Sequence, residues 1–108
     1  MAFYRCNAAS GSSTSEVKYG SYTTSNTTSV SVSIGFDPDV VVVWQSPGDA
    51  RGFFAESRSK GSFSGKTWAS TTAGTNIGTF TWSGTSFTHK AYNSQMSGMT
   101  AYYMAYKA

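Results

Sequence analysis

The residues whose types could support nucleophilic or metal chemistry are few, and His89 and Cys6 come first. His89 is the only histidine of the chain and Cys6 is the only cysteine. A nucleophile–base pair would need His89 beside Cys6 or a serine, with a carboxylate that orients the ring. The surrounding "TFTWSGTSFTHK" is instead a simple strand pattern. One cysteine and one histidine cannot complete a zinc site within one chain, although three copies of His89 could meet on a trimer axis.

The acidic residues point to turns and not to a reaction centre. A calcium loop needs several oxygen ligands at tight spacing, and a general acid–base pair needs two carboxylates facing one cleft. Asp beside Pro or Gly is ordinary turn chemistry. The five acidic residues are Asp37 and Asp39, which flank Pro38, Asp49 after Pro47-Gly48, and the separate Glu16 and Glu56. We therefore expect no catalytic residue, no metal site and no cofactor.

Residues 51–68 interleave basic and aromatic side chains, the types that a single-stranded nucleic-acid platform uses. They are Arg51, Arg58, Lys60 and Lys66 with Phe53, Phe54, Phe63 and Trp68. The segment contains no run typical of RNA-recognition or cold-shock modules, and the basic residues are scattered at a net charge of only +3. A nucleic-acid-binding β module stays open as an alternative, but nucleic acid is not the expected partner.

Aromatic residues near polar loops could instead stack on sugar rings. Trp68, Trp82 and Tyr92 lie in such positions and are the candidate ligand-facing aromatics. Core positions are the favoured interpretation for aromatic residues in a small domain. A stand-alone carbohydrate-binding lectin is therefore the second alternative.

The elements that would position these residues are β-strands. The 108 residues contain no leucine, seven valines, two isoleucines and 16% aromatic residues, which suit a pleated, half-buried surface. The length predicts one domain over residues 1–108, with residues 1–16 as a flexible or docking arm. We expect oligomerisation, since a domain this small hides only about two-thirds of its unfolded surface. No segment has the roughly 20 apolar residues of a membrane span, and none predicts a secretory signal.

One stretch changes its pattern halfway along. Residues 30–34 alternate Val or Ile with Ser, which predicts a strand with one wet face. Gly35, Phe36 and Pro38 form a predicted corner, because glycine permits unusual backbone angles and proline fixes its own. Residues 40–44 are apolar on both faces, which predicts a central strand covered on each side by a second sheet or another subunit.

The remaining strand patterns predict an all-β antiparallel β-sandwich or jelly roll. Turn signals separate short strand patterns about every 8–12 residues. Residues 39–57 are predicted to form a hairpin, and residues 101–108 a closing apolar strand. Residues 58–76 are rich in small side chains and give no clear strand order.

Two stretches carry a resemblance to a known group of proteins. "IGFDPDVVVVW", residues 34–44, resembles a pattern of bacteriophage tail-fibre, tail-tip and related virion structural proteins, in which a Gly-Phe-x-Pro corner leads into a Val/Ile-rich strand. The closing "SGMTAYYMAYKA" is similar to the Tyr-x-Ala-x strand that ends those modules. The resemblance implies a non-catalytic, β-rich virion component, commonly homotrimeric, that serves assembly or host attachment.

This resemblance and the apolar pattern together set our expectations for partners and contacts. We expect a homo-oligomer, with a trimer favoured, that docks on other phage virion proteins and presents loops to a host surface glycan. It would be made in the cytoplasm of the host bacterium and reside in the virion, and the lone thiol of Cys6 fits that compartment. The residues expected in the core or at subunit contacts are Val40, Val41, Val42, Val43 and Trp44, with Tyr102, Tyr103, Met104 and Tyr106.

The size of the chain departs from that of a fibre. It begins at Met1 and contains no coiled-coil or shaft segment. A capsid decoration protein and a head or collar spike are therefore expected on equal terms with a tail-fibre or tail-tip subunit.

Overall fold

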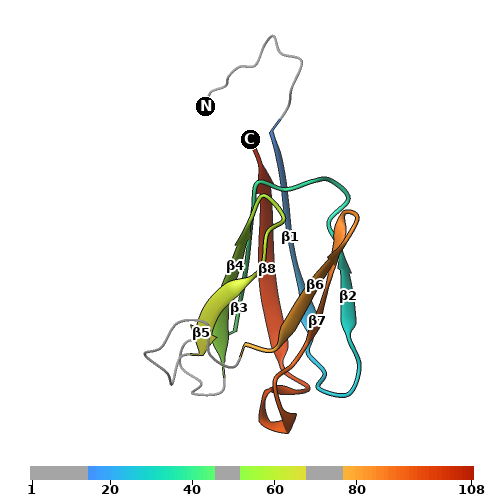
Figure 1. The fold of residues 1–108 in the computed structure, drawn as a ribbon, viewed down its shortest axis with the longest axis vertical. Coiled ribbons are helices and arrows are strands. Elements are labelled where there is room, and N and C mark those ends of the chain that lie inside the picture. Colours follow the sequence, from blue (N-terminus) through green and yellow to red (C-terminus); the bar gives the residue numbers. More distant parts are fainter. Residues whose placement is uncertain (1–14, 46–51, 68–76) are drawn as a thin grey trace.

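Two antiparallel sheets of five and three strands pack face to face as a β-sandwich (Figure 1). A computed structural model describes residues 15–45, 52–67 and 77–108. The predicted all-β sandwich is thereby confirmed. Cys6, Trp68, the Pro47-Gly48 turn and most of the predicted arm lie outside the described residues, and Glu16 already belongs to the first strand.

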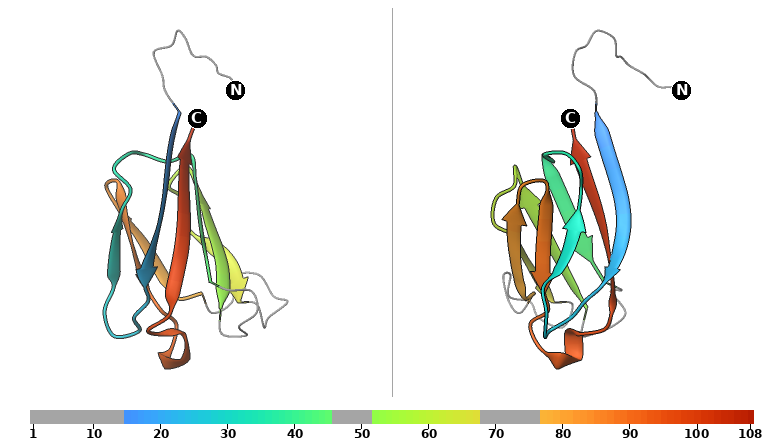
Figure 2. Two further views of the ribbon diagram at one scale, coloured as in Figure 1. Left: turned by 180° about the vertical axis from the view of Figure 1, so that it is seen from behind. Right: turned by 90° about the vertical axis from the view of Figure 1, so that its right-hand side faces the viewer.

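The larger sheet places the longest strands side by side. Its order is β1 (Glu16–Thr23), β8 (Thr100–Lys107), β3 (Val40–Trp44), β4 (Phe53–Arg58) and β5 (Ser64–Thr67). The predicted hairpin is confirmed, since β3 pairs antiparallel with β4, and the closing strand β8 is the other neighbour of β3. The start of β1 and the end of β8 meet at one end of the molecule, because Glu16 pairs with Lys107 (Figure 2).

The smaller sheet has the order β2 (Val30–Ser33), β7 (Ser86–Lys90) and β6 (Thr79–Ser83). In β2 the serines are exposed and Val32 is buried, as the alternating pattern predicts. A short 3-10 helix, Ser94–Met96, precedes β8. Its first turn is capped by Asn93, whose side chain accepts a hydrogen bond from the backbone N–H of Met96.

The predicted corner carries the chain from the smaller sheet to the larger one. Gly35 has a φ of 90°, a conformation that favours glycine. The backbone N–H of Ile34 donates to the carbonyl of Thr85 at 2.9 Å, which ties the end of β2 to the turn between β6 and β7. Phe36 packs against the core and Pro38 is buried. Val40 then begins β3 on the opposite sheet.

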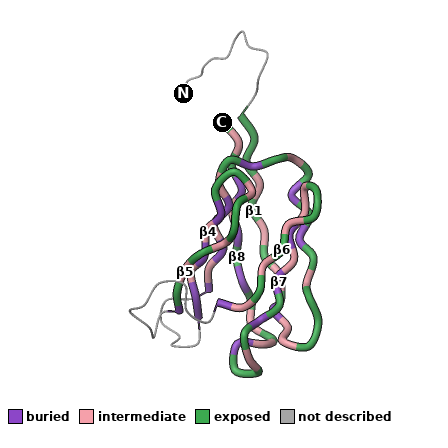
Figure 3. Tube along the Cα trace, in the orientation of Figure 1, coloured by how far each residue is buried: buried purple, intermediate pink, exposed green. Residues whose placement is uncertain are grey.

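The hydrophobic core lies between the two sheets. Val41, Val43 and Phe53 from the larger sheet and Phe87 from the smaller sheet are fully buried. Tyr103 meets Phe87 edge-on, with ring centroids 6.2 Å apart. Figure 3 shows how buried and exposed residues alternate along the strands. Each sheet therefore has one inner face, which forms the core, and one outer face.

Candidate functional site

The two faces of β3 have different surroundings. Val41 and Val43 point into the core and are fully buried, whereas Val40, Val42 and Trp44 are half-buried on the outer face of the larger sheet. Of the two covers predicted for the second side of this strand, a second sheet is absent among the described residues, and another subunit stays a prediction. The smaller sheet covers only the inner side of β3, and the outer side is part of the molecular surface.

Cross-strand pairing extends this apolar surface over the neighbouring strands. Residues directly opposite one another in antiparallel strands project from the same face. Tyr106 lies opposite both Val17 and Val40, so the three share one row across β1, β8 and β3. Met104 likewise lies opposite both Tyr19 and Val42.

A third row completes the surface. Trp44 lies between Tyr102 and Phe54, and the rings of Trp44 and Tyr102 pack with centroids 6.2 Å apart. We call the whole set the outer apolar face. It consists of Val17 and Tyr19 on β1, Tyr102, Met104 and Tyr106 on β8, Val40, Val42 and Trp44 on β3, and Phe54 on β4.

The exposed large apolar side chains of the described residues gather on this face. Tyr19 is 72% exposed, Val17 and Tyr102 are each 47% exposed, and Tyr106 is 38% exposed. Tyr92 is the other exposed large side chain, and it lies away from the sheet just before the 3-10 helix. A contiguous apolar patch of this kind marks an interaction surface more often than a solvated one.

On the outer surface of the larger sheet, charged side chains lie only to one side of the outer apolar face, among the described residues. Among the described outward-facing residues of the larger sheet, the charged ones are Glu56, Arg58 and Lys66, on β4 and β5. Arg58 donates to the Glu56 carboxylate at 3.1 Å, so these two charges balance each other. Across β1, β8 and β3 the outer face is free of charged side chains.

The outer face of the smaller sheet has the opposite character. Pairing places Thr81, Thr88 and Ser31 in one row, and Ser83, Ser86 and Ser33 in the next. Thr79 and Lys90 complete the face. The described strands of this sheet thus present only Ser, Thr and Lys outward, and the chain has one polar and one apolar outer face.

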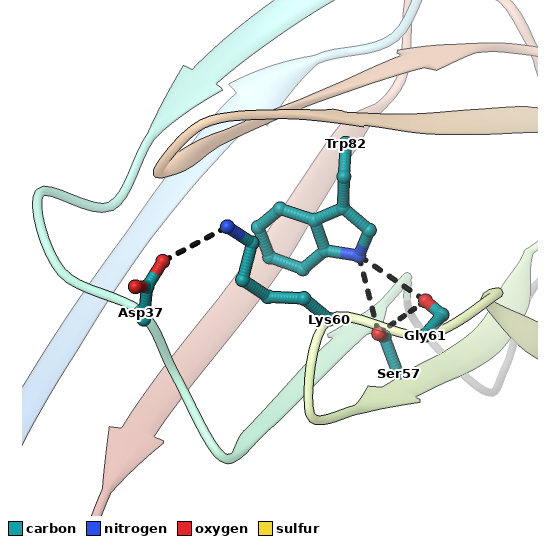
Figure 4. A network of polar contacts seen from close by, with 5 residues as sticks. All are labelled: Asp37, Ser57, Lys60, Gly61 and Trp82. Atoms are coloured by element: carbon teal, nitrogen blue, oxygen red, sulfur yellow. Dashed lines mark hydrogen bonds and ion pairs between the residues drawn. The ribbon is translucent and has the colours of Figure 1, made fainter.

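Trp82 joins the two sheets and offers little of its ring to a ligand. Its indole N–H lies 3.2 Å from both the Ser57 hydroxyl and the Gly61 carbonyl oxygen (Figure 4). Its ring stacks on Phe63 with centroids 5.7 Å apart, and the Lys60 ammonium lies 5.7 Å from the ring centre. Of the other two candidate ligand-facing aromatics, Tyr92 is exposed elsewhere, just before the 3-10 helix, and Trp68 lies outside the described residues.

Lys60 also connects this end of the sandwich to the corner. Its ammonium donates to the Asp37 carboxylate at 2.8 Å (Figure 4). This hydrogen bond and the positive charge of Lys60 hold the pKa of Asp37 below its usual range. Ser59 and Lys60 adopt positive φ angles of 51° and 58° in the turn that brings the ammonium there.

The basic and aromatic segment does not form a stacking platform in its described part. Phe53 is fully buried, and Phe63 stacks on Phe80 with ring centroids 4.3 Å apart, so both belong to the core. Base stacking needs exposed aromatic faces along a strand path. Phe54 alone lies on an outer surface, on the other side of β4 from Phe53.

His89 is a core residue with both ring nitrogens in use. Its Nε2 lies 2.9 Å from the carbonyl oxygen of Ile77, which can only accept, so Nε2 carries the proton. Its Nδ1 accepts from the Tyr22 hydroxyl at 2.8 Å, and its ring stacks on Phe80 with centroids 3.9 Å apart. His89 is fully buried, and this burial lowers its pKa to about 4. The alternative of three histidines sharing a metal on a trimer axis is therefore excluded in this fold.

The described residues contain no group of three or more His, Cys, Asp or Glu side chains that could hold a metal ion. They also contain no helix that is long and apolar enough to cross a membrane. Searches with the whole chain find no matching family model, no matching curated protein and no matching solved structure.

The sequence prediction missed three members of the outer apolar face. Val17 and Tyr19 alternate with Lys18 and Gly20, a signal for a two-faced strand that cannot say which face meets the core. Phe54 follows another phenylalanine, so the sequence did not reveal which of the two points outward. The predicted contact residues, in turn, divide between the core, which holds Tyr103, and the outer apolar face.

Proposed function

We propose that this chain is a structural component of a bacteriophage virion surface. It acts as a capsid decoration protein, a head or collar spike, or a tail-fibre or tail-tip subunit. Its work is assembly, together with contact to a host glycan, and it performs no catalysis. It is synthesised in the host bacterial cytoplasm and resides in the virion.

The contrast between the two outer faces is the observation that supports this proposal most. A particle component needs one surface for attachment and another that stays in water. The outer apolar face, with Trp44 and three tyrosines, has the residue types that dominate protein–protein contacts. The Ser/Thr-rich outer face of the smaller sheet suits permanent contact with solvent.

The resemblance at the corner and at the C-terminal strand supports the same assignment. "GFDPDVVVVW" supplies the crossing from Gly35 into β3, and "SGMTAYYMAYKA" supplies β8. These two segments pair directly with each other and build the centre of the outer apolar face. The stretches that resemble virion proteins are thus the ones that would make the assembly contact.

The proposal is tested by looking for the chain in particles. Particles from the phage or prophage that encodes it are purified on a density gradient, and their proteins are identified by mass spectrometry. An antibody raised against the folded domain then locates the chain by immunogold electron microscopy. We expect co-purification at several copies per particle and gold on the head, collar or tail. Particles that contain no trace of the chain would overturn the proposal.

A further inference from the structure

We infer that the outer apolar face packs against the same face of another copy of this chain. The inference rests on the proposed function in treating this face as an assembly surface, and it names the partner. In β2, where one side is solvated, the outward residues are serines. In β3 and β8 the outward residues are Val40, Val42 and Met104 among aromatic side chains, and the three are only half-buried. These residues need a cover that the described part of the chain does not supply.

Charge favours a second copy over a strongly charged partner. The face carries no charged side chain on β1, β8 or β3, so two copies approach without repulsion across its centre. Glu56 and Arg58 stand at successive outward positions on β4. A two-fold arrangement that reverses the strand direction brings Glu56 of one copy toward Arg58 of the next, so the charged margin is self-complementary.

The hydroxyl groups of the face suit a contact between proteins. Within the described part of the chain, the hydroxyls of Tyr19, Tyr102 and Tyr106 have no hydrogen-bond partner. Tyrosine offers a large apolar ring and one polar end, a combination enriched at protein contacts because the hydroxyl finds a partner or water at the margin. Trp44 and Tyr102, packed together at the centre of their row, are the expected anchors of the contact.

The size of the face sets the expected strength. Four strands spaced about 4.8 Å apart and five residues along each, at about 3.4 Å per residue, give a flat area of roughly 19 Å by 17 Å. Protruding side chains raise the accessible area above this, toward but not beyond the roughly 800 Å² per partner of a standard interface. We therefore expect a concentration-dependent association with a dissociation constant on the order of micromolar.

The test is the mass of the full chain in solution, measured by sedimentation equilibrium from about 0.1 μM to about 0.1 mM, a range that brackets a micromolar constant. Val42→Glu places a charge at the centre of the face. Tyr19→Lys changes a residue that is 72% exposed, so it leaves the core intact even if the first variant fails to fold. Thr81→Glu, on the polar outer face of the smaller sheet, is the matched control.

We expect the unaltered chain and Thr81→Glu to associate equally into dimers, because a contact between identical faces is two-fold. Tyr19→Lys should weaken the association at least tenfold, and a folded Val42→Glu should stay monomeric. The inference is overturned if the unaltered chain is a monomer throughout, or if all three variants associate like it. It is also overturned if Thr81→Glu weakens association as much as Tyr19→Lys does.

The two proposals fail separately. A chain found in particles but monomeric in solution would overturn this inference and leave the virion assignment in place. A chain that associates through the outer apolar face but is missing from particles would overturn the virion assignment alone.

Discussion

Gly20 of β1 lies directly opposite Tyr103 of β8, and the phenol ring of Tyr103 occupies the space that a side chain on Gly20 would need. A Cβ atom placed on Gly20 would lie 2.6 Å from the Tyr103 ring and hydroxyl. Tyr103 is only 6% exposed and meets Phe87 of the smaller sheet edge-on. The missing side chain of Gly20 therefore lets a core aromatic lie across β1.

Gly20→Ala should destabilise the domain. At an ordinary strand position the same change stabilises the fold by roughly 0.5–1 kcal/mol, because glycine loses more conformational freedom on folding than alanine. The methyl group must displace the buried ring of Tyr103, and overpacking of this kind costs about 1–3 kcal/mol. Urea unfolding should show a lower midpoint with an unchanged slope.

The ring itself provides the control for this prediction. In a Tyr103→Leu background the methyl group meets no phenol, so Gly20→Ala should cost little there. An equal cost in both backgrounds would mean that the effect does not come from Tyr103. Ser21→Ala, at the neighbouring exposed position, should change the free energy of unfolding by less than about 0.5 kcal/mol.

Adjacent valines of β3 should respond differently to the same charge. Val43→Asp puts a carboxylate into the core, where Val43 is fully buried, and should cost more than about 4 kcal/mol and abolish folding. Val42→Asp puts it on the outer apolar face, where it retains access to water, and the monomer should lose only about 1–2 kcal/mol. Thermal melts by circular dichroism, at protein concentrations low enough to keep the chain monomeric, distinguish the two variants. Equal losses would contradict the assignment of the two faces.

This pair of valines also shows what the sequence could and could not predict. The alternation of residues 30–34 fixed the inward side of β2, because polar and apolar residues differ there. In an unbroken run of valines no such difference exists, so the sequence predicted two covered faces without showing which one the second sheet covers, and the described residues cover one. The orientation of β3 follows from its pairing with β4 and β8 and from the position of the smaller sheet.

Long-range pairing explains the other gaps in prediction. The hairpin of β3 and β4 joins neighbouring segments and was predictable from a short stretch of sequence. The pairing of β1 with β8 joins the two ends of the described chain, and only this pairing places Tyr19 beside Met104. Trp82 reaches Ser57 and Gly61 across the sandwich in a similar way. The outer apolar face and the Trp82 contacts therefore emerge only once the strands are assembled.

Trp82→Phe should weaken the link between the two sheets. Phenylalanine keeps an aromatic ring beside Phe63 but loses the indole N–H that points at the Ser57 hydroxyl and the Gly61 carbonyl. A lost hydrogen bond of this kind costs about 0.5–1.5 kcal/mol. Urea unfolding measures the loss, and Thr81→Ala, one residue away on the opposite face, is the control. A loss no larger than that of the control would show that the indole contacts contribute nothing.

The buried His89 should make the free energy of unfolding depend on pH. Burial lowers its pKa to about 4, from about 6.5 for an unperturbed histidine. The unfolded chain therefore binds a proton at His89 in a pH range where the folded chain does not. Stability rises with pH wherever the unfolded state binds more protons, so the contribution of His89 is complete above about pH 7. It declines as the pH falls from about 6.5 toward 4.

The total loss between these limits should be about 3 kcal/mol, at about 1.4 kcal/mol for each unit of difference in pKa. Urea unfolding midpoints should fall steadily as the pH is lowered from 7.5 to 4.5. Most of this fall should occur above about pH 5, before ordinary carboxylates begin to titrate. Because His89 is the only histidine, His89→Gln should be less stable at pH 7.5 but nearly independent of pH down to about 5. A variant that keeps the full pH dependence would assign it to other groups, and an unaltered chain that is equally stable at pH 7.5 and 5 would contradict the buried, neutral ring.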